Sequence, residues 1–151
     1  MLDKLFPKKI NYLLELIRFN KPIGFLLLMW PCWFGLSLLK TEINFKLYIL
    51  FFIGSFLMRS AGCIINDIVD IKIDRKIMRT SSRPLTSKKL SIEEAVFFLI
   101  LLLFLSLFIL LQFKFITILV GFLSIPLIVI YPFMKRFFYF PQIVLGIVFS
   151  W

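Results

Sequence analysis

The stretch SIEEAVFFLILLLFLSLFILL, residues 91–111, decides the class of fold. Ser91 and Glu94 have the spacing of a capping box, which predicts that a helix begins at Ser91. No charged residue follows Glu94 before Lys114, so the predicted helix is apolar all round. At 1.5 Å per residue, about 20 such residues give about 30 Å of helix, the thickness of a bilayer core. The stretch therefore predicts a transmembrane helix.

Further apolar stretches repeat this pattern along the chain. The predicted spans are residues 22–39, 47–65, 92–111, 115–133 and 137–151. The last would cover only about 22 Å, which is short of a full crossing. We expect an all-α polytopic transmembrane helical bundle that is incomplete, with about four full spans and a truncated fifth. Before the first span, Ile10, Leu13, Leu14 and Ile17 have helical spacing, which favours an amphipathic surface helix over a polar tail.

The composition excludes several classes of protein. Hydrophobic residues make up 61% of the 151 residues, against about 45–50% in soluble domains, which excludes a soluble enzyme or a disordered chain. The absence of His excludes imidazole catalysis and His-ligated metals. The two cysteines, Cys32 and Cys63, lie in apolar surroundings and are interpreted as packing residues rather than a disulfide or zinc site.

The positive charge is distributed unevenly between the two sides of the predicted bundle. Fourteen of the 18 Lys and Arg lie before the first span, between the second and third, or after the fourth. Only Lys40, Lys46 and Lys114 lie on the other side, and Arg59 lies within a span. This bias predicts that the N-terminus and the loop between spans two and three are cytoplasmic. It also explains the net charge of +10 without a nucleic-acid partner.

Acidic residues cluster at the predicted cytoplasmic end of the second span. Asp67, Asp70 and Asp74 are three and seven residues apart, so a helix places them on one face, and Asn66 joins that face. Carboxylates this close repel one another unless a cation lies among them. Oxygen ligands without His or Cys suit a hard cation, Mg²⁺ before Ca²⁺. The cluster is therefore a candidate metal site.

Basic residues follow the acidic cluster directly. They are Lys72, Arg75, Lys76, Arg79 and Arg83. Carboxylates for a metal and basic groups for phosphate oxygens together suit a phosphate-bearing substrate. The basic residues alone are equally typical of a solvated cytoplasmic loop with internal salt bridges, and taken by themselves they favour that interpretation.

Arg59 is a charge within a predicted span. Such a charge costs at least about 2.5 kcal/mol, so it is usually functional or paired. It precedes Asn66 by seven residues and therefore shares the face of the acidic cluster, deeper in the membrane. Two roles remain open: a structural ion pair with the aspartates, or contact with an acidic group of a substrate.

The stretch from Met58 to Asp74, followed by Arg79-Thr-Ser-Ser-Arg83-Pro84-Leu85, resembles the first aspartate-rich signature of the UbiA-type intramembrane prenyltransferases. Residues 18–24 and the stretch from Tyr131 to Gly146 are also similar to this family, in its 4-hydroxybenzoate polyprenyltransferase branch. The resemblance covers nearly the whole chain and implies the N-terminal half of a prenyltransferase domain in a bacterial or mitochondrial inner membrane.

The resemblance implies Mg²⁺-dependent transfer of a polyprenyl group from polyprenyl diphosphate to 4-hydroxybenzoate, a step of ubiquinone biosynthesis. Metal ligation would fall to Asn66, Asp67, Asp70 and Asp74. Diphosphate binding would fall to Lys72, Arg75, Arg79 and Arg83. Arg59, with Arg18 as second choice, would bind the aromatic acid.

The sequence departs from the family pattern at several points. It has no second aspartate-rich motif, and family members are about twice as long. Asn20, Ile71 and Lys88 stand where the family often has Asp, Arg and Gly. We therefore expect the isolated chain to be inactive and to need a separate C-terminal half. The alternative is a non-catalytic remnant or subunit. A cation transporter is disfavoured because the other spans contain almost no acidic or polar residues.

Overall fold

The computed structural model describes residues 7–38, 44–137, 140, 142–143 and 146–147, with residues 131–137 described by their backbone alone. Within these ranges every regular element is a helix, as the sequence predicts. The helices are α1 (Lys8–Leu16), α2 (Ile23–Leu38), α3 (Phe45–Asp74), α4 (Met78–Ser81), α5 (Ile92–Leu110) and α6 (Phe115–Phe137).

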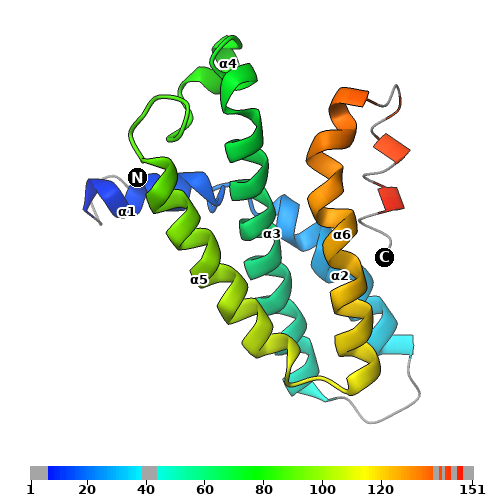
Figure 1. Ribbon diagram of the computed structural model, residues 1–151. Coiled ribbons are helices and arrows are strands. Elements are labelled where there is room, and N and C mark those ends of the chain that lie inside the picture. Colours follow the sequence, from blue (N-terminus) through cyan, green and yellow to red (C-terminus); the bar gives the residue numbers. More distant parts are fainter. Residues whose placement is uncertain (1–6, 39–43, 138–139, 141, 144–145, 148–151) are drawn as a thin grey trace.

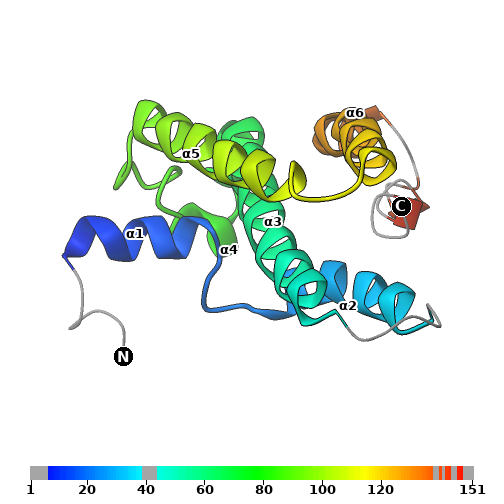
Figure 2. The same cartoon turned by 90° about the horizontal axis from the view of Figure 1, so that it is seen from below.

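The helix α3 is the central element of the bundle. Both α2 and α5 pack against it along much of its length, and α6 contacts it less extensively (Figures 1 and 2). The sequence predicts a span over residues 47–65, but the helix continues without a break to Asp74. The acidic cluster therefore lies on the same continuous helix as the apolar span.

Two of the described helices, α3 and α5, are long and apolar enough to cross a membrane. The helix α2 and the segment Phe115–Ile130 of α6 are apolar but shorter. The predicted fifth span, residues 137–151, lies for the most part outside the described residues. Large apolar side chains such as Phe97, Phe104 and Phe108 of α5 are exposed, as on a helix that faces lipid.

The main buried cluster of the described residues includes the end of α1, where that helix approaches α3 at one end of the bundle (Figures 1 and 2). Leu16 and Ile17, at the end of α1, belong to this cluster together with Ile64 of α3. The segment between α4 and α5 contributes Leu85 and Leu90 to the same cluster. The predicted helix therefore exists, and Leu13, Leu14 and Ile17 of its apolar face pack on protein, whereas Ile10 is exposed.

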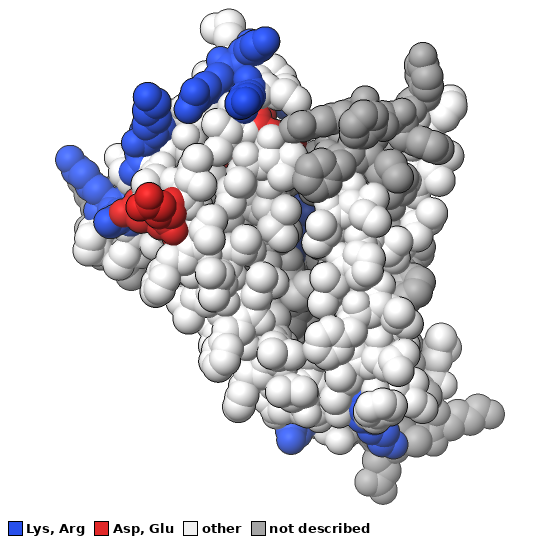
Figure 3. Space-filling view, in the orientation of Figure 1, with Lys and Arg blue, Asp and Glu red and all other residues white. Residues whose placement is uncertain are grey.

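Charged side chains gather at this same end, which we call the charged end: α1, the end of α3, α4 and residues 75–91. Lys and Arg cover its surface over α4 and α1, whereas the outer surface of the middle of the bundle is largely uncharged in this view (Figure 3). The helix α5 begins here with the predicted capping box. The Ser91 hydroxyl accepts from the Glu94 amide, and the Glu94 carboxylate accepts from the Ser91 amide.

Candidate functional site

Asp67 and Asp74 form the acidic part of the site at the charged end. They are two turns apart on the same face of α3, and they are only 3% and 6% exposed. Asp70 and Asn66 are half-buried on the same stretch. The structure therefore confirms that the cluster is helical. It also shows that the cluster faces the protein.

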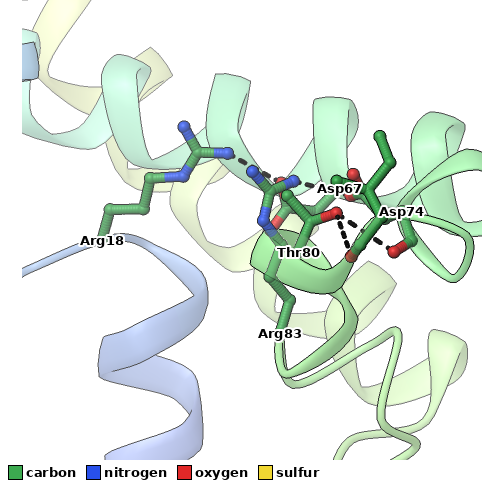
Figure 4. A network of polar contacts seen from close by, with 6 residues as sticks. Arg18, Asp67, Asp74, Thr80 and Arg83 are labelled. Carbon is green, nitrogen blue, oxygen red and sulfur yellow. Dashed lines mark hydrogen bonds and ion pairs between the residues drawn. The ribbon is translucent and has the colours of Figure 1, made fainter.

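Arg83 bridges the two buried aspartates. Its Nη1 donates to Asp67 Oδ1 at 3.1 Å and to Asp74 Oδ2 at 2.6 Å (Figure 4). The neighbours of Arg83 hold it in place, because Pro84 and Leu85 are buried in the adjoining core. The hydroxyl of Thr80, in α4, donates to the backbone oxygen of Asp74 at 3.1 Å and ties the same segment to the end of α3.

Arg18 reaches the same carboxylate from the end of α1. Its Nη2 donates to Asp67 Oδ1 at 2.9 Å (Figure 4). Arg18 has a positive φ of 57°, and the hydrogen bonds around it form a Schellman motif, in which the amides of Arg18 and Phe19 donate to Glu15 and Leu14. Glycine usually occupies that position, so the chain accepts backbone strain where the arginine meets the site.

The two guanidinium groups neutralise the buried carboxylates. The sequence argument requires a cation among the aspartates, and in this structure Arg18 and Arg83 supply the positive charge. No three Asp, Glu, His or Cys side chains in the described ranges gather into a metal site. Nη1 of Arg83 occupies a point from which one group contacts a carboxylate oxygen of each aspartate. Magnesium in proteins usually binds one or two carboxylates together with substrate phosphates. The two aspartates therefore fit Mg²⁺ chemically.

A cavity of about 410 Å³ adjoins this cluster, between the α1–α2 connection and α3. Three cationic side chains line it, Arg18, Lys21 and Arg59. Phe25 and Phe56 supply apolar walls, with their rings edge to face at a centroid distance of 5.6 Å. The cavity therefore combines positive charge with aromatic surface, which suits an aromatic anion.

Arg59 belongs to this cavity and not to the acidic cluster. Among the described residues it forms no ion pair with a carboxylate, so the structural ion pair considered from the sequence is absent there. Its guanidinium lies against the first turn of α2, beside Gly24. Arg59 and Arg18, the first and second choices from the sequence for binding the aromatic acid, both line this cavity.

The predicted basic residues separate into two groups. Arg83 lies inside the cluster, whereas Lys72, Arg75 and Arg79 are exposed on the surface around it. Sequence reasoning did not single out Thr80 or Lys21. Lys21 belongs to the motif that runs from Arg18 to Gly24. Its positive charge directly before an apolar span was the feature that could have identified it as a candidate binding residue. The backbone contact of Thr80 has no comparable sequence signal.

The fold and the site together define a helical membrane protein with an acidic cluster at one end of its central helix and a cationic, aromatic-lined cavity beside it. The chain belongs to the UbiA prenyltransferase family, whose model matches residues 28–151. The acidic cluster and Arg59 lie inside the matched region, whereas α1 and Arg18 precede it.

Curated relatives support this assignment. The chain is 46% identical to a 4-hydroxybenzoate octaprenyltransferase from Blochmanniella pennsylvanica, over 97% of this chain and 51% of the relative. It is 44% identical to a mitochondrial 4-hydroxybenzoate polyprenyltransferase from Dictyostelium discoideum, over 97% of this chain and 32% of the relative. A Pseudoalteromonas translucida 4-hydroxybenzoate octaprenyltransferase is 43% identical, over 99% and 52%. The chain thus spans about half the length of the bacterial relatives. No solved structure matches it.

Proposed function

We propose that this chain provides the first aspartate motif and the aromatic-acid pocket of an enzyme that transfers a polyprenyl group from polyprenyl diphosphate to 4-hydroxybenzoate. The transfer would be Mg²⁺-dependent and would serve ubiquinone synthesis in a bacterial or mitochondrial inner membrane. The names of the relatives support the substrates and the reaction. The apolar helices α3 and α5 support the membrane location that a long polyprenyl tail requires.

The observation that carries the proposal is the position of Arg18. Its side chain pairs with Asp67 of the acidic cluster, and the same residue lines the cationic cavity. A diphosphate at the cluster and an aromatic acid in the cavity would therefore lie next to each other. Transfer between two substrates requires such a close approach.

At the cluster, Asp67 and Asp74 are the leading candidates to hold magnesium, with Asp70 and Asn66 beside them on the same stretch of α3. When bound there, the metal would neutralise the negative charge of the departing diphosphate. Arg83 lies beside these carboxylates, and once the metal takes the place of its Nη1 between them, its guanidinium would donate to phosphate oxygens. The exposed residues Lys72, Arg75 and Arg79 would attract the anionic substrate from solution.

In the cavity, Arg59 and Arg18 would pair with the carboxylate of the aromatic acid, because an unpaired carboxylate in an apolar site is costly. The rings of Phe25 and Phe56 would hold the flat substrate ring and exclude water. A ring carbon beside the hydroxyl then bonds to the prenyl carbon, and diphosphate leaves with the bonding electrons. The ring afterwards loses a proton and regains aromaticity.

The test of the metal site is binding of a prenyl diphosphate to membranes that contain the protein, with and without Mg²⁺. We expect Asp67→Ala and Asp70→Ala to abolish the Mg²⁺-dependent part of binding, because they remove charge from the metal–phosphate contact. Glu15→Ala, which changes an exposed acid of α1, is the matched control and should bind as the parent does. Equal Mg²⁺-dependent binding by the parent and both aspartate variants would contradict the proposal.

A second assay separates catalysis from a subunit role. It measures prenylation of 4-hydroxybenzoate in membranes of a host without its own enzyme, with this chain alone or co-expressed with the C-terminal half of a curated relative. Activity only in the second arm supports a subunit role. Turnover by this chain alone supports catalysis by one aspartate cluster, and no activity in either arm supports a non-catalytic protein.

A further inference from the structure

Arg59 has an unusual neighbour in the first turn of α2. A Cβ atom built on Gly24 would lie 2.7 Å from Arg59 Nε, 3.1 Å from Nη2 and 3.2 Å from Cζ. Real Cβ atoms essentially never approach another heavy atom to within 3.0 Å. The guanidinium group therefore lies in space that is free only because residue 24 has no side chain.

The other glycines of α2 and α3 do not share this property. A Cβ at Gly35, in the same helix, or at Gly62, in α3, would meet nothing within 4 Å. Helix propensity favours alanine over glycine at ordinary helical positions. The close approach of Arg59 distinguishes Gly24 from these two glycines, which makes them suitable controls.

We propose that Gly24 is a positioning residue, which sets the place of the Arg59 guanidinium in the aromatic-acid pocket. The proposal rests on the proposed function, in which Arg59 binds the carboxylate of the aromatic substrate. A Cβ at position 24 would push the guanidinium away from α2, and it would do so without removing its charge. An arginine binds a carboxylate through two parallel hydrogen bonds, so a shift of part of an ångström weakens the pairing.

The first measurement is binding of 4-hydroxybenzoate and of a prenyl diphosphate to the full chain in membranes. We expect Gly24→Ala to weaken 4-hydroxybenzoate binding about tenfold and to change Mg²⁺-dependent diphosphate binding by less than about twofold. Gly35→Ala and Gly62→Ala should leave both affinities unchanged. Unaltered 4-hydroxybenzoate binding by Gly24→Ala would overturn the proposal.

The second measurement tests the coupling between the two residues. Lysine keeps the charge of Arg59 but lacks the Nε–Cζ plane that meets the added Cβ. In an Arg59→Lys background, we therefore expect Gly24→Ala to change 4-hydroxybenzoate binding by less than about twofold. An equal loss in both backgrounds would mean that alanine distorts α2 as a whole, and the positioning role would then be wrong.

A third measurement needs no substrate and therefore separates this inference from the proposed function. The rate at which phenylglyoxal modifies Arg59, followed by mass spectrometry, reports the surroundings of its guanidinium. We expect Gly24→Ala to change that rate several-fold and Gly35→Ala to leave it unchanged. If the parent does not bind 4-hydroxybenzoate, the proposed function fails, whereas an unchanged modification rate in Gly24→Ala is what rejects the positioning role.

Discussion

At the scale of single residues, the charged end depends on which arginine meets which carboxylate. One nitrogen of Arg83 contacts two buried aspartates, and Arg18 contacts one of them. Arg79, four residues before Arg83, is exposed. All three residues are arginines, so charge alone does not explain why Arg18 and Arg83 pair with the aspartates and Arg79 is exposed. Arg83 differs because the buried residues that follow it fix its backbone beside the cluster.

Removal of Arg83 should therefore destabilise the protein. Among the described residues, Arg83→Leu removes the ion pair of Asp74 and leaves Asp67 with one ion-pair partner, Arg18, and loss of one member of a buried pair costs about 3 kcal/mol. We expect a lower midpoint of thermal unfolding in detergent. Arg79→Leu, at an exposed position, should change the midpoint little. A similar fall in both variants would show that the bridge contributes nothing specific.

At Lys88, by contrast, we expect a substitution to increase the thermal stability of the protein. It is exposed and has a φ of 59°, a conformation that costs a residue with a side chain about 1 kcal/mol more than glycine. Lys88→Gly should therefore raise the thermal midpoint by a few degrees. The control is Lys76→Gly, at an exposed position without positive φ, which should give no gain. A gain in both variants would point to loss of positive charge as the cause.

At the scale of elements, α5 begins at its capping box, and residues at this helix start also contact α1. Glu94 completes the box and also forms an ion pair with Lys9 of α1. Lys89, just before α5, lies 5.3 Å from the centre of the Tyr12 ring of α1. The start of α5 is therefore a junction between two helices as well as a helix end.

Ser91→Ala tests the capping box. It should destabilise α5 by about 1 kcal/mol, because the Glu94 amide loses its side-chain acceptor. Hydrogen exchange at the first turn of α5 would localise the effect. Glu94→Gln should cost much less, since glutamine can complete the box and an exposed ion pair contributes little. If Glu94→Gln is the more damaging change, the contact with α1 matters more than the cap.

At the scale of the whole molecule, the central helix α3 connects a weakly charged end to the charged end. Its first turn carries Lys46, and its last turn carries Asp74 and adjoins the basic surface over α4. Two of the described helices are long and apolar enough to cross a membrane, and their orientation remains a prediction from the Lys and Arg bias. The two ends of α3 should therefore face opposite compartments.

Cysteine labelling can test that orientation. Cys32 and Cys63 are first replaced by alanine, and single cysteines are then introduced as Ser87→Cys at the charged end or Lys46→Cys at the other end, both exposed positions. In intact bacterial cells whose periplasm is accessible, a membrane-impermeant thiol reagent should label residue 46. Residue 87 should react only after the inner membrane is opened. The reverse pattern would contradict the predicted topology.

Much of the local structure was predictable. The capping box places the start of α5, the apolar runs place α2, α3, α5 and α6, and the spacing of the aspartates places them on one face. The predicted span, residues 47–65, is shorter than α3, because hydrophobicity does not identify the charged last turns; only the spacing of the aspartates indicated that those turns are helical. Burial against Arg83 stabilises those turns, and this contact lies outside their own sequence.

The sequence by itself determined the helical membrane class, the acidic cluster and the family, because these depend on composition and on spacings within a few turns. Only the tertiary structure decided that Arg18 meets Asp67, 49 residues away, that Arg83 and not Arg79 joins the cluster, and that Arg59 lies against Gly24. The physical reason is the range of the interactions. Periodicity and capping act between residues three or four apart, whereas these pairings depend on how α1, α2 and the segment before α5 pack around α3.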